Sequence, residues 1–404
     1  MSILVINAGS SSLKFGLFDV DARETLATGL IDWTADPQHA TLIVQSTGKD
    51  DVRSHVDVAD HRSALAHAVR LLVGTEPDAS DGLPAIRAIG HRVVHGGTLF
   101  LESTLIDSSV KAAIARLAEL APLHNPPALE GIAAAEATFP GMPQVAVFDT
   151  AFHAHLPLEA HVYPLPYEWY SHWGIRRFGF HGISHAYCAS RAAEMLSRNL
   201  CDLRLVSCHL GNGCSAAAIR GGVSAATTMG FTPLEGLMMG SRPGSVDPGI
   251  LVYVQQRHGL TSGQLEDLLN HRSGLLGISG VSSDFRQVEV AAREGNDRAR
   301  LALDIYAARV RAAVGALAVT MGGIDALVFT AGVGEHSATL RAAACDGLAC
   351  LELRLDRQYN AASQPDADIA TADSPGRILI IHTREELMIA RETCRVALHN
   401  SKPR

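Results

Sequence analysis

The sequence predicts a two-domain α/β protein built from two related halves. At 404 residues the chain is longer than one hydrophobic core usually supports, so two domains are expected. Residues 3–17 and residues 203–222 share one plan: a strand, a tip of glycine with asparagine or serine, and a second strand. Tips without bulky side chains leave backbone N–H groups room to lie against a phosphate, and such turns favour the positive φ of tight hairpins. We therefore expect the hairpins to be equivalent phosphate-binding elements facing one cleft.

The composition is that of a globular protein and argues against several classes of partner. Apolar residues make up 47% and charged residues 19% of the chain, and the formal net charge is −8. This charge disfavours a nucleic acid or an anionic membrane as the main partner. Seven cysteines fit a reducing compartment, no signal peptide is visible, and the apolar segment 313–334 contains Asp325 and several glycines. We expect a soluble cytoplasmic protein.

The region after the first hairpin alternates between strand and helix patterns. A strand is expected at 41–44, a solvated loop or edge strand at 49–53, and an amphipathic helix at 63–73. Residues 85–97 read as a strand that ends in a glycine turn. Arg92 is placed there as loop-borne ligand contacts often are, although a surface arginine beside a turn is equally compatible.

The next segment combines a helix, a proline-rich break and a buried strand. Residues 108–120 read as a helix, and the prolines of 122–127 predict a rigid loop. Residues 145–153 read as a buried strand that ends in Asp149. A carboxylate at the end of such a strand commonly lies at a ligand crevice, but an N-cap is an equally good interpretation.

His181 and His185 are four residues apart, a spacing that on a helix can chelate a metal. No third ligand is evident, so we favour a helix that begins near Ser184, with His181 on the preceding loop as a donor to an anion.

The second half contains a long glycine-rich stretch, residues 229–244, whose one cation is Arg242. Long structured loops usually carry function. A loop is expected at 274–280, closed by residues 284–286. Helices are expected at 248–258, 263–271 and 296–321.

The last part of the chain begins with a strand, a glycine turn and a helix start over residues 326–337. A G-x-G after a strand is only a weak dinucleotide signal. A final strand at 378–381 precedes a helix that Thr383 and Glu386 would open as a capping box, which leaves Glu385 free to point elsewhere.

These features together are suited to phosphoryl transfer. The P-loop pattern, the nucleophile elbow and zinc-ligand spacing are absent from the sequence. Two small-residue hairpins, arginines on glycine loops, a loop histidine and acids at element ends are present instead. Phosphoryl transfer needs this set, because its catalysis is mostly positioning and neutralisation of charge.

Nine motifs in order along the chain resemble those of the acetate kinase family: INAGSSSLKF, HRVVHGG, PLHNPP, FDTAFH, RRFGFHGISH, HLGNG, MGFTPLEGL, AGVGEH and EELMIAR. The resemblance implies a duplicated ribonuclease H-like fold of the actin-like and sugar kinase type, with a central nucleotide cleft. We expect an N-terminal domain of residues 1–150 plus 386–404 and a nucleotide-binding domain of residues 151–385. The resemblance also implies a homodimer that transfers the ATP γ-phosphoryl group reversibly to acetate with Mg²⁺ or Mn²⁺.

The resemblance assigns roles to individual residues. Arg92 would bind the acetate carboxylate, Arg242 and His181 would stabilise the transferring phosphoryl group, and Asp149 matches the acidic active-site residue. Because acetate is already ionised at neutral pH, we favour orientation and electrostatics over proton abstraction for Asp149. Asn7 and Glu385 match metal positions. The methyl pocket would comprise Val94, Leu123, Phe180 and Pro233. The ATP-binding positions would be Lys14, His209, Leu210, Gly211, Asn212, Gly213, Asp284, Phe285, Arg286, Gly332, Val333, Gly334, Glu335 and His336.

Three departures from the family pattern, at His336, at Ala226 and within residues 241–245, leave the expected catalytic residues in place. Propionate kinase shares nearly all the motifs, and one methylene changes binding by only about 1–3 kcal/mol, so the preference for acetate rests on Val94. From another class, the same fold hosts ATP-driven proteins that bind protein partners. The two arginines and the apolar pocket residues argue against that alternative.

Overall fold

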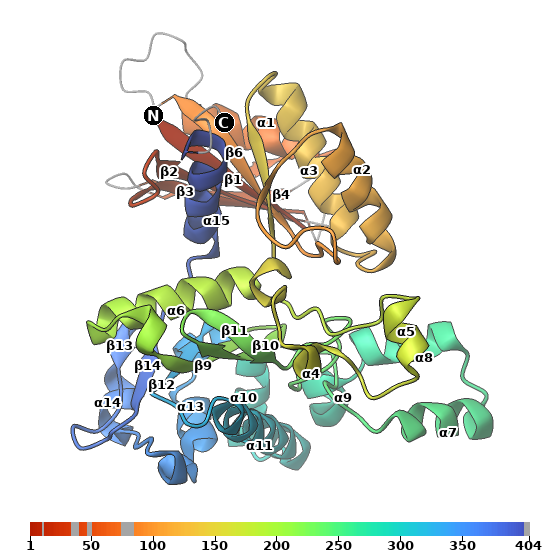
Figure 1. The fold of residues 1–404 in the computed structure, drawn as a ribbon, viewed down its shortest axis with the longest axis vertical. Coiled ribbons are helices and arrows are strands. Elements are labelled where there is room, and N and C mark those ends of the chain that lie inside the picture. The colour runs from red at the N-terminus through yellow and green to blue at the C-terminus, as the bar shows by residue number, and fades with distance from the viewer. Residues whose placement is uncertain (10–11, 34–39, 47–50, 74–84, 400–404) are drawn as a thin grey trace. The chain divides into compact units, whose positions relative to one another are not determined.

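The computed structural model describes residues 1–9, 12–33, 40–46, 51–73 and 85–399 (Figure 1). The chain divides into a first unit, Met1–Ala154 with Arg384–Arg404, and a second unit, His155–Thr383. These divisions lie a few residues from the expected boundaries, and they place Glu385 in the first unit rather than in the nucleotide-binding domain. The expectations for Ser10, Ser11 and residues 49–50 fall outside the described residues.

The sheet of the first unit contains eight strands in the order β5-β4-β3-β2-β1-β6-β8-β7. Strands β1 to β5 form an antiparallel meander, and β1, β6 and β8 are parallel neighbours. The strands are β1 (Ser2–Ala8), β2 (Ser12–Asp19), β3 (Thr25–Asp32), β4 (Ala40–Ser46), β5 (Val52–Val56), β6 (Ile86–Val93), β7 (Thr104–Leu105) and β8 (Gln144–Phe148). The first predicted hairpin is therefore confirmed as β1 and β2.

Helices cover both faces of this sheet. The helices are α1 (His61–Val73), α2 (Ser108–Arg116), α3 (Asn125–Thr138) and α15 (Glu385–Cys394). Leu4 and Ile6 of β1 pack with residues of α1 and α3. Since strand side chains alternate between faces, Asn7 belongs to the opposite face. Helix α15 packs there: a Cβ at Gly90 would lie 2.2 Å from Oγ1 of Thr393. Figure 1 shows α15 (blue) beside β1 and β6.

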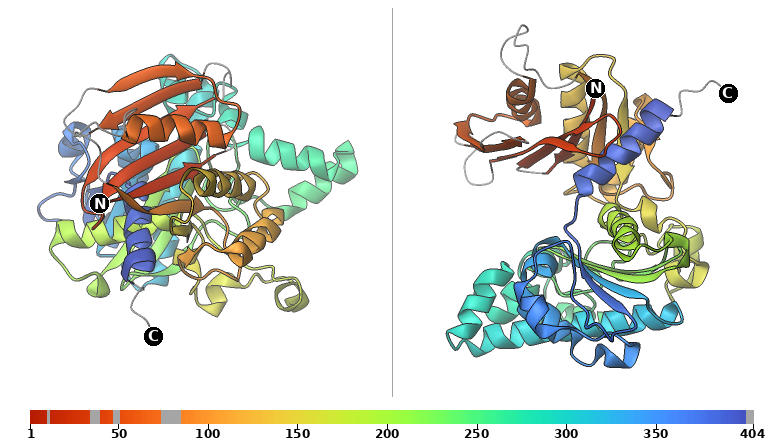
Figure 2. Two further views of the ribbon diagram at one scale, coloured as in Figure 1. Left: turned by 90° about the horizontal axis from the view of Figure 1, so that it is seen from above. Right: turned by 90° about the vertical axis from the view of Figure 1, so that its left-hand side faces the viewer.

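The sheet of the second unit contains six strands in the order β11-β10-β9-β12-β14-β13. They are β9 (Arg204–Leu210), β10 (Cys214–Arg220), β11 (Val223–Thr227), β12 (Ala326–Thr330), β13 (Ala367–Asp368) and β14 (Arg377–Ile380). Helices α6 and α11 pack on it, from opposite faces as Figures 1 and 2 show. The helices are α4 (Leu158–His161), α5 (Tyr167–Ser171), α6 (Gly182–Leu196), α7 (Pro248–His258), α8 (Ser262–His271), α9 (Gly274–Ser279), α10 (Phe285–Arg293), α11 (Asp297–Thr320), α12 (Ala331–His336), α13 (Ala338–Cys345) and α14 (Arg357–Ala362).

The two sheets repeat one topology. In the first unit the order β3-β2-β1-β6-β8 places an antiparallel meander beside two parallel strands, and β11-β10-β9-β12-β14 does the same in the second unit. Hairpins β1–β2 and β9–β10 occupy equivalent places. The predicted class, a duplicated two-unit α/β fold, is confirmed.

Three expected loops or turns are helical instead. The prolines at 126 and 127 lie in the first turn of α3, where a missing N–H costs nothing because it has no intrahelical partner. Residues 274–279 form α9, and residues 331–336 form α12 in place of the glycine turn. Each of these two helices has only six residues, too few for a periodic apolar pattern to reveal it.

The predicted capping box and the positive φ expected at the second hairpin tip are wrong. The N-cap position of α15 is Arg384, without a side-chain cap, because the backbone N–H of Thr383 donates to Glu335 and its hydroxyl pairs with Ser184. Helix α6 begins at Gly182, close to the expected start, and His181 directly precedes it, as expected, with a φ of 56°. Neither Gly211 nor Gly213 has a φ in the left-handed region; at Gly213 the small size matters instead, because a Cβ there would lie 3.0 Å from Nη2 of Arg242.

A buried histidine on β6 makes the stability of the fold sensitive to acid. Nε2 of His91 lies 2.6 Å from Oε1 of Gln144, and burial lowers the pKa of His91 from 6.5 to about 4. Between these values the unfolded chain binds a proton that the native state does not, so stability falls as pH drops through this window. We expect this group to remove about 3 kcal/mol of unfolding free energy between pH 7 and pH 4.

Denaturant titrations at a series of pH values measure this loss. The variant His91→Gln should show a shallower decline, and an identical decline in both proteins would contradict the assignment.

Candidate active site

The first unit gathers several predicted site residues at one edge of its sheet. Asn7 lies near the carboxyl end of β1, Arg92 near that of β6, and Asp149 directly follows β8. Because β1, β6 and β8 are parallel neighbours, these ends meet at the same edge, where ligands of open α/β sheets usually bind. Asn7 and Arg92 also lie on the face that α15 covers.

Arg92 and Asp149 form a two-point ion pair. Nε of Arg92 lies 3.3 Å from Oδ1 of Asp149, and Nη2 lies 2.5 Å from Oδ2. The exposed side-chain fraction is 21% for Arg92 and 1% for Asp149. Burial by itself lowers the pKa of Arg92, but the carboxylates of Asp149 and Glu385 outweigh it and raise that pKa overall. The guanidinium is therefore held charged and in a fixed orientation.

Glu385, the first residue of α15, adds a second acid to this cluster. Its Oε1 is buried and makes no hydrogen bond in the described part of the chain. Burial raises the pKa of Glu385, while the positive charges of Arg92 and Lys14 oppose the rise. Lys14 is exposed and lies opposite Asn7 in the hairpin register. The first unit thus brings together Asn7, Lys14, Arg92, Asp149 and Glu385.

In the second unit, two histidines stack beside the β9–β10 hairpin. The rings of His181 and His209 have centroids 4.1 Å apart and are inclined by 23°. Nδ1 of His181 lies 2.9 Å from Oγ of Ser215, and Nδ1 of His209 lies 2.8 Å from Oγ of Ser184. Both ring nitrogens of His185 also face serine hydroxyls, those of Ser207 and Ser215. The pair His181 and His185 therefore forms part of a serine–histidine network rather than a chelate.

The glycine at the hairpin tip lets a cation and an imidazole approach each other. A Cβ at Gly213 would lie 3.0 Å from Nη2 of Arg242 and 3.4 Å from Nε2 of His181. Nη1 of Arg242 donates to the carbonyl of Pro233 at 2.6 Å, which fixes the guanidinium. Burial lowers the pKa of Arg242 below its usual value, although the group stays cationic at neutral pH. A guanidinium and an imidazole thus converge at the tip.

This crowding predicts the effect of a methyl group at the tip. We expect Gly213→Ala to displace Arg242 and His181 by a few tenths of an ångström and to lower kcat about tenfold, because small misplacements are costly in catalysis. Unfolding free energy should change little. The control is Gly263→Ala in α8, where a Cβ meets no atom within 4 Å. Steady-state kinetics and denaturation measure both quantities; an unchanged kcat in Gly213→Ala would contradict the assignment.

The predicted nucleotide-binding segments differ in what they expose. Gly332 and His336 on α12 are exposed, and Gly334 and Glu335 are buried. The carboxylate of Glu335 accepts hydrogen bonds from the backbone N–H groups of Ala331 and Thr383 and pairs with His382 at 2.6 Å. Burial would raise the pKa of Glu335, but these partners lower it overall. Glu335 therefore stabilises α12 and joins it to residues 382 and 383.

The remaining segment, Asp284 to Arg286, opens α10. Asp284 accepts from the backbone N–H of Arg286 as N-cap and also pairs with its guanidinium at 2.7 Å. Phe285 is buried against Tyr306. Only the polar residues of this segment are on the surface.

The four predicted methyl-pocket residues divide between the units. Val94 and Leu123 belong to the first unit, and Phe180 and Pro233 to the second. Leu123 is exposed, Phe180 is buried, and Val94 and Pro233 are half-buried. Neither unit alone carries the complete set.

The hydroxyl groups that hold the histidines were not anticipated. Ser207 and His209 alternate along β9, and Ser215 lies opposite His209 on β10. Ser184 and His185 occupy the first turn of α6, which packs on β9. Polar residues at alternate positions of otherwise apolar strands were the available signal, because they share one face.

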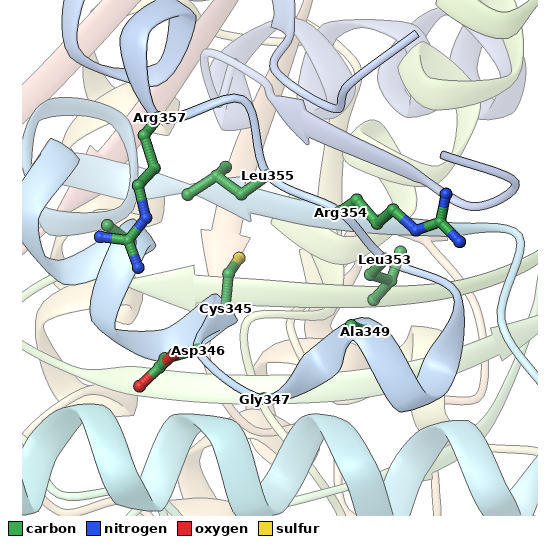
Figure 3. Close-up of a pocket in the computed structure, with 9 residues that line it drawn as sticks. Cys345, Asp346, Gly347, Ala349, Leu353, Arg354, Leu355 and Arg357 are labelled. Carbon is green, nitrogen blue, oxygen red and sulfur yellow. The ribbon is translucent and has the colours of Figure 1, made fainter. Parts of the chain in front are cut away.

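The second unit also contains a cavity that lies apart from the predicted site residues. It has a volume of about 230 Å³ and is lined by Cys345, Leu353, Arg354, Arg357 and neighbours. Figure 3 shows the guanidinium groups of Arg354 and Arg357 at opposite sides of it. No predicted site residue lines this cavity. In the described residues no three His, Cys, Asp or Glu side chains group to hold a metal ion, and no helix is long and apolar enough to span a bilayer.

Comparisons with known proteins match this chain over almost its whole length. The acetokinase family profile matches residues 2–391. The acetate kinase of Cyanothece sp. (strain PCC 7425 / ATCC 29141) is 51% identical over 408 residues, covering 100% of both chains. The Porphyromonas gingivalis acetate kinase structure superposes with a TM-score of 0.90 at 39% identity, covering 98% of this chain and 99% of that one. A propionate kinase from Francisella tularensis gives 0.89 at 38% identity, with the same coverage. The chain belongs to the acetokinase family.

Proposed function

We propose that this protein transfers the γ-phosphoryl group of ATP reversibly to acetate, giving acetyl phosphate and ADP. Membership of the acetokinase family over residues 2–391 supports this activity. The observation that carries the chemistry is the convergence of Arg242 and His181 at the tip of the β9–β10 hairpin. Donors fixed beside a small-residue tip suit a reaction that depends on neutralising phosphoryl charge.

The first unit supplies the groups suited to the carboxylate. Arg92 presents a planar guanidinium, which matches a carboxylate in two-point geometry. Asp149 holds Arg92 in orientation and balances its charge. Because acetate is already an anion at neutral pH, no base has to remove a proton from it. Asp149 therefore acts through orientation and electrostatics. Lys14, whose side chain is exposed on β2, supplies further positive charge.

The cation site proposed for Mg²⁺ or Mn²⁺ comprises Asn7 and Glu385. Glu385 has a buried oxygen without a hydrogen-bond partner in the described residues, and amide and carboxylate oxygens are the ligands these ions prefer. Mg²⁺ often uses one or two protein ligands and keeps several waters, so this small set fits. The ion would neutralise phosphate charge when bound. Asn7 and Glu385 would hold it, and Arg92 would remain beside them.

The preference for acetate over propionate depends on the apolar residues Val94, Leu123, Phe180 and Pro233. One additional methylene changes binding by only about 1–3 kcal/mol, so the same machinery serves either acid. A propionate kinase is among the structural neighbours, so propionate is the competing substrate. We propose acetate on the basis of Val94.

Trapping of the acyl phosphate by hydroxylamine tests the function. Parallel reactions contain ATP, Mg²⁺ and equimolar acetate, propionate or butyrate, with EDTA in a further set. We expect hydroxamate with acetate at the highest kcat/KM and none with EDTA. A higher kcat/KM with propionate would overturn the substrate assignment alone. The absence of product with every acid would overturn the function and favour an ATPase with a protein partner.

We also propose that the protein is a homodimer that uses the surface of α7. This helix has no buried residue, and its Ile250, Val252 and Tyr253 are 52%, 52% and 56% exposed. Exposed apolar patches commonly mark protein interfaces. Light scattering coupled to size-exclusion chromatography should give twice the mass of 42.9 kDa, and Tyr253→Asp should shift it towards the monomer. A monomeric wild-type protein would contradict the proposal.

A further inference from the structure

A chain of hydrogen bonds runs from the core of the second unit to His181. Oγ of Ser207 lies 3.0 Å from Nδ1 of His185, and Nε2 of His185 lies 2.8 Å from Oγ of Ser215. Oγ of Ser215 lies 2.9 Å from Nδ1 of His181. Ser207, His185 and Ser215 are each 0% exposed. These three residues are therefore shielded from solvent.

Burial determines which partner donates in each of these hydrogen bonds. Among the described residues, the hydroxyl of Ser207 has one hydrogen-bond partner, Nδ1 of His185. An unsatisfied buried donor costs more than an unused acceptor lone pair, so Ser207 donates to that nitrogen. The alternative, a cationic His185, is disfavoured because burial penalises the charged form.

The donation by Ser207 determines which ring nitrogen of His185, and then of His181, carries the proton. A neutral His185 that accepts at Nδ1 carries its proton on Nε2 and donates it to Ser215. The hydroxyl hydrogen of Ser215 is then directed to Nδ1 of His181. His181 accepts at Nδ1, so in its neutral form the proton is on Nε2. That nitrogen lies towards the hairpin tip, 3.4 Å from the Cβ position of Gly213.

The charges around His181 also favour a neutral ring. Nη2 of Arg242 lies 3.0 Å from the same Cβ position, so a cation already adjoins the imidazole. His209 of β9 stacks on the ring at 4.1 Å, and His185 of α6 is joined to it through Ser215. Two stacked imidazolium rings beside a guanidinium would repel one another.

We propose that His181 donates to the transferring phosphoryl group as a neutral imidazole with its proton on Nε2, and that Ser207, His185 and Ser215 are positioning residues that hold it in that form. The inference deepens the proposed function and rests on it. A neutral donor works equally well above and below the ordinary pKa of histidine. An imidazolium would lose its role as pH rises through that value.

The first test compares the wild-type protein with His181→Gln, whose amide supplies a donor that does not titrate. Taking the ratio of the two kcat values cancels the titration of every other group. We expect the ratio to stay constant within about twofold between about pH 6 and pH 9. A ratio that falls about tenfold per pH unit above the ordinary pKa of histidine would overturn the proposal.

The second test does not depend on activity. In ¹⁵N-histidine-labelled protein, the spectrum of His181 (assigned by its loss in His181→Gln) should show a protonated Nε2 and an unprotonated Nδ1. Ser215→Ala should shift the Nδ1 resonance of His181 and lower kcat about tenfold while leaving KM for ATP nearly unchanged. The matched control is Ser190→Ala on α6, whose hydroxyl bonds only to the carbonyl of Ala186 and which should change neither quantity.

The outcomes distinguish a failure of the positioning role from a failure of the proposed function. A proton on Nδ1 in the wild-type protein, or an Nδ1 resonance unmoved by Ser215→Ala, would overturn the positioning role and leave the proposed function intact. If Ser215→Ala does not fold, Ser207→Ala serves in its place, and the wild-type spectrum still decides. A protein that forms no acyl phosphate would overturn the proposed function, while the spectrum would still report the tautomer.

Discussion

Arg242→Ala is expected to lower kcat by about a thousandfold while changing the affinity for ATP by less than about threefold. The guanidinium lies at the hairpin tip, fixed by the carbonyl of Pro233 at 2.6 Å. We propose that its donors face the phosphoryl group, and such contacts strengthen in the transition state rather than in the ground state. Steady-state kinetics combined with calorimetric binding of ATP separates the two quantities. Equal losses in turnover and affinity would contradict this role.

Two further variants sharpen this test. Arg242→Lys keeps the positive charge and loses the planar fork, so we expect it to recover only part of the lost turnover. Arg298 is an arginine of the same unit that also donates to backbone carbonyls, those of Ile278 and Gly277. It lies on α11 and has no predicted role, so Arg298→Ala should leave kcat within about twofold.

Asp149→Asn is expected to abolish activity and to lower the unfolding free energy by about 3–5 kcal/mol. The side chain of Asp149 is 1% exposed, and its loss of charge leaves the guanidinium of Arg92 buried without its partner. Breaking such a pair is costly because the remaining charge has already lost its hydration. Denaturant titration measures the stability loss, and hydroxamate formation measures the activity.

The double variant Arg92→Met with Asp149→Leu separates stability from function. Removing both charges leaves neither member of the Arg92–Asp149 pair buried without its partner, so we expect most of the lost stability to return. Activity should remain absent because the group proposed to bind the carboxylate is gone. A double variant as unstable as Asp149→Asn would show that the pair stabilises the fold by more than charge compensation.

Much of the architecture follows from local patterns in the sequence. Both hairpins are marked by apolar strands around small-residue tips, α11 by periodic apolar positions, and α7 by its capping residues Asp247 and Gly259. Helices α9 and α12 were missed because each is one to two turns long and is stabilised by contacts distant in sequence. The N–H of Leu275, for example, donates to the carbonyl of Met239.

The contacts among the predicted site residues could not be read from the sequence. Arg92 and Asp149 are 57 residues apart, and their contact depends on the pairing of β6 with β8. Ser215 joins His181 to His185 only because β10 pairs with β9 under α6. Thr383 reads as a helix cap locally, yet its N–H is taken by Glu335. Tertiary partners override local preferences at these positions.

The central claim is direct transfer of the phosphoryl group to a carboxylate that is already ionised, with His181 as a donor rather than a nucleophile. The stereochemical course at phosphorus tests this claim most directly. ATP made chiral at the γ-phosphorus by oxygen isotopes is converted to acetyl phosphate, and the configuration of the product is determined. A single in-line displacement predicts inversion. Retention would require two displacements through a phosphorylated side chain and would contradict the account.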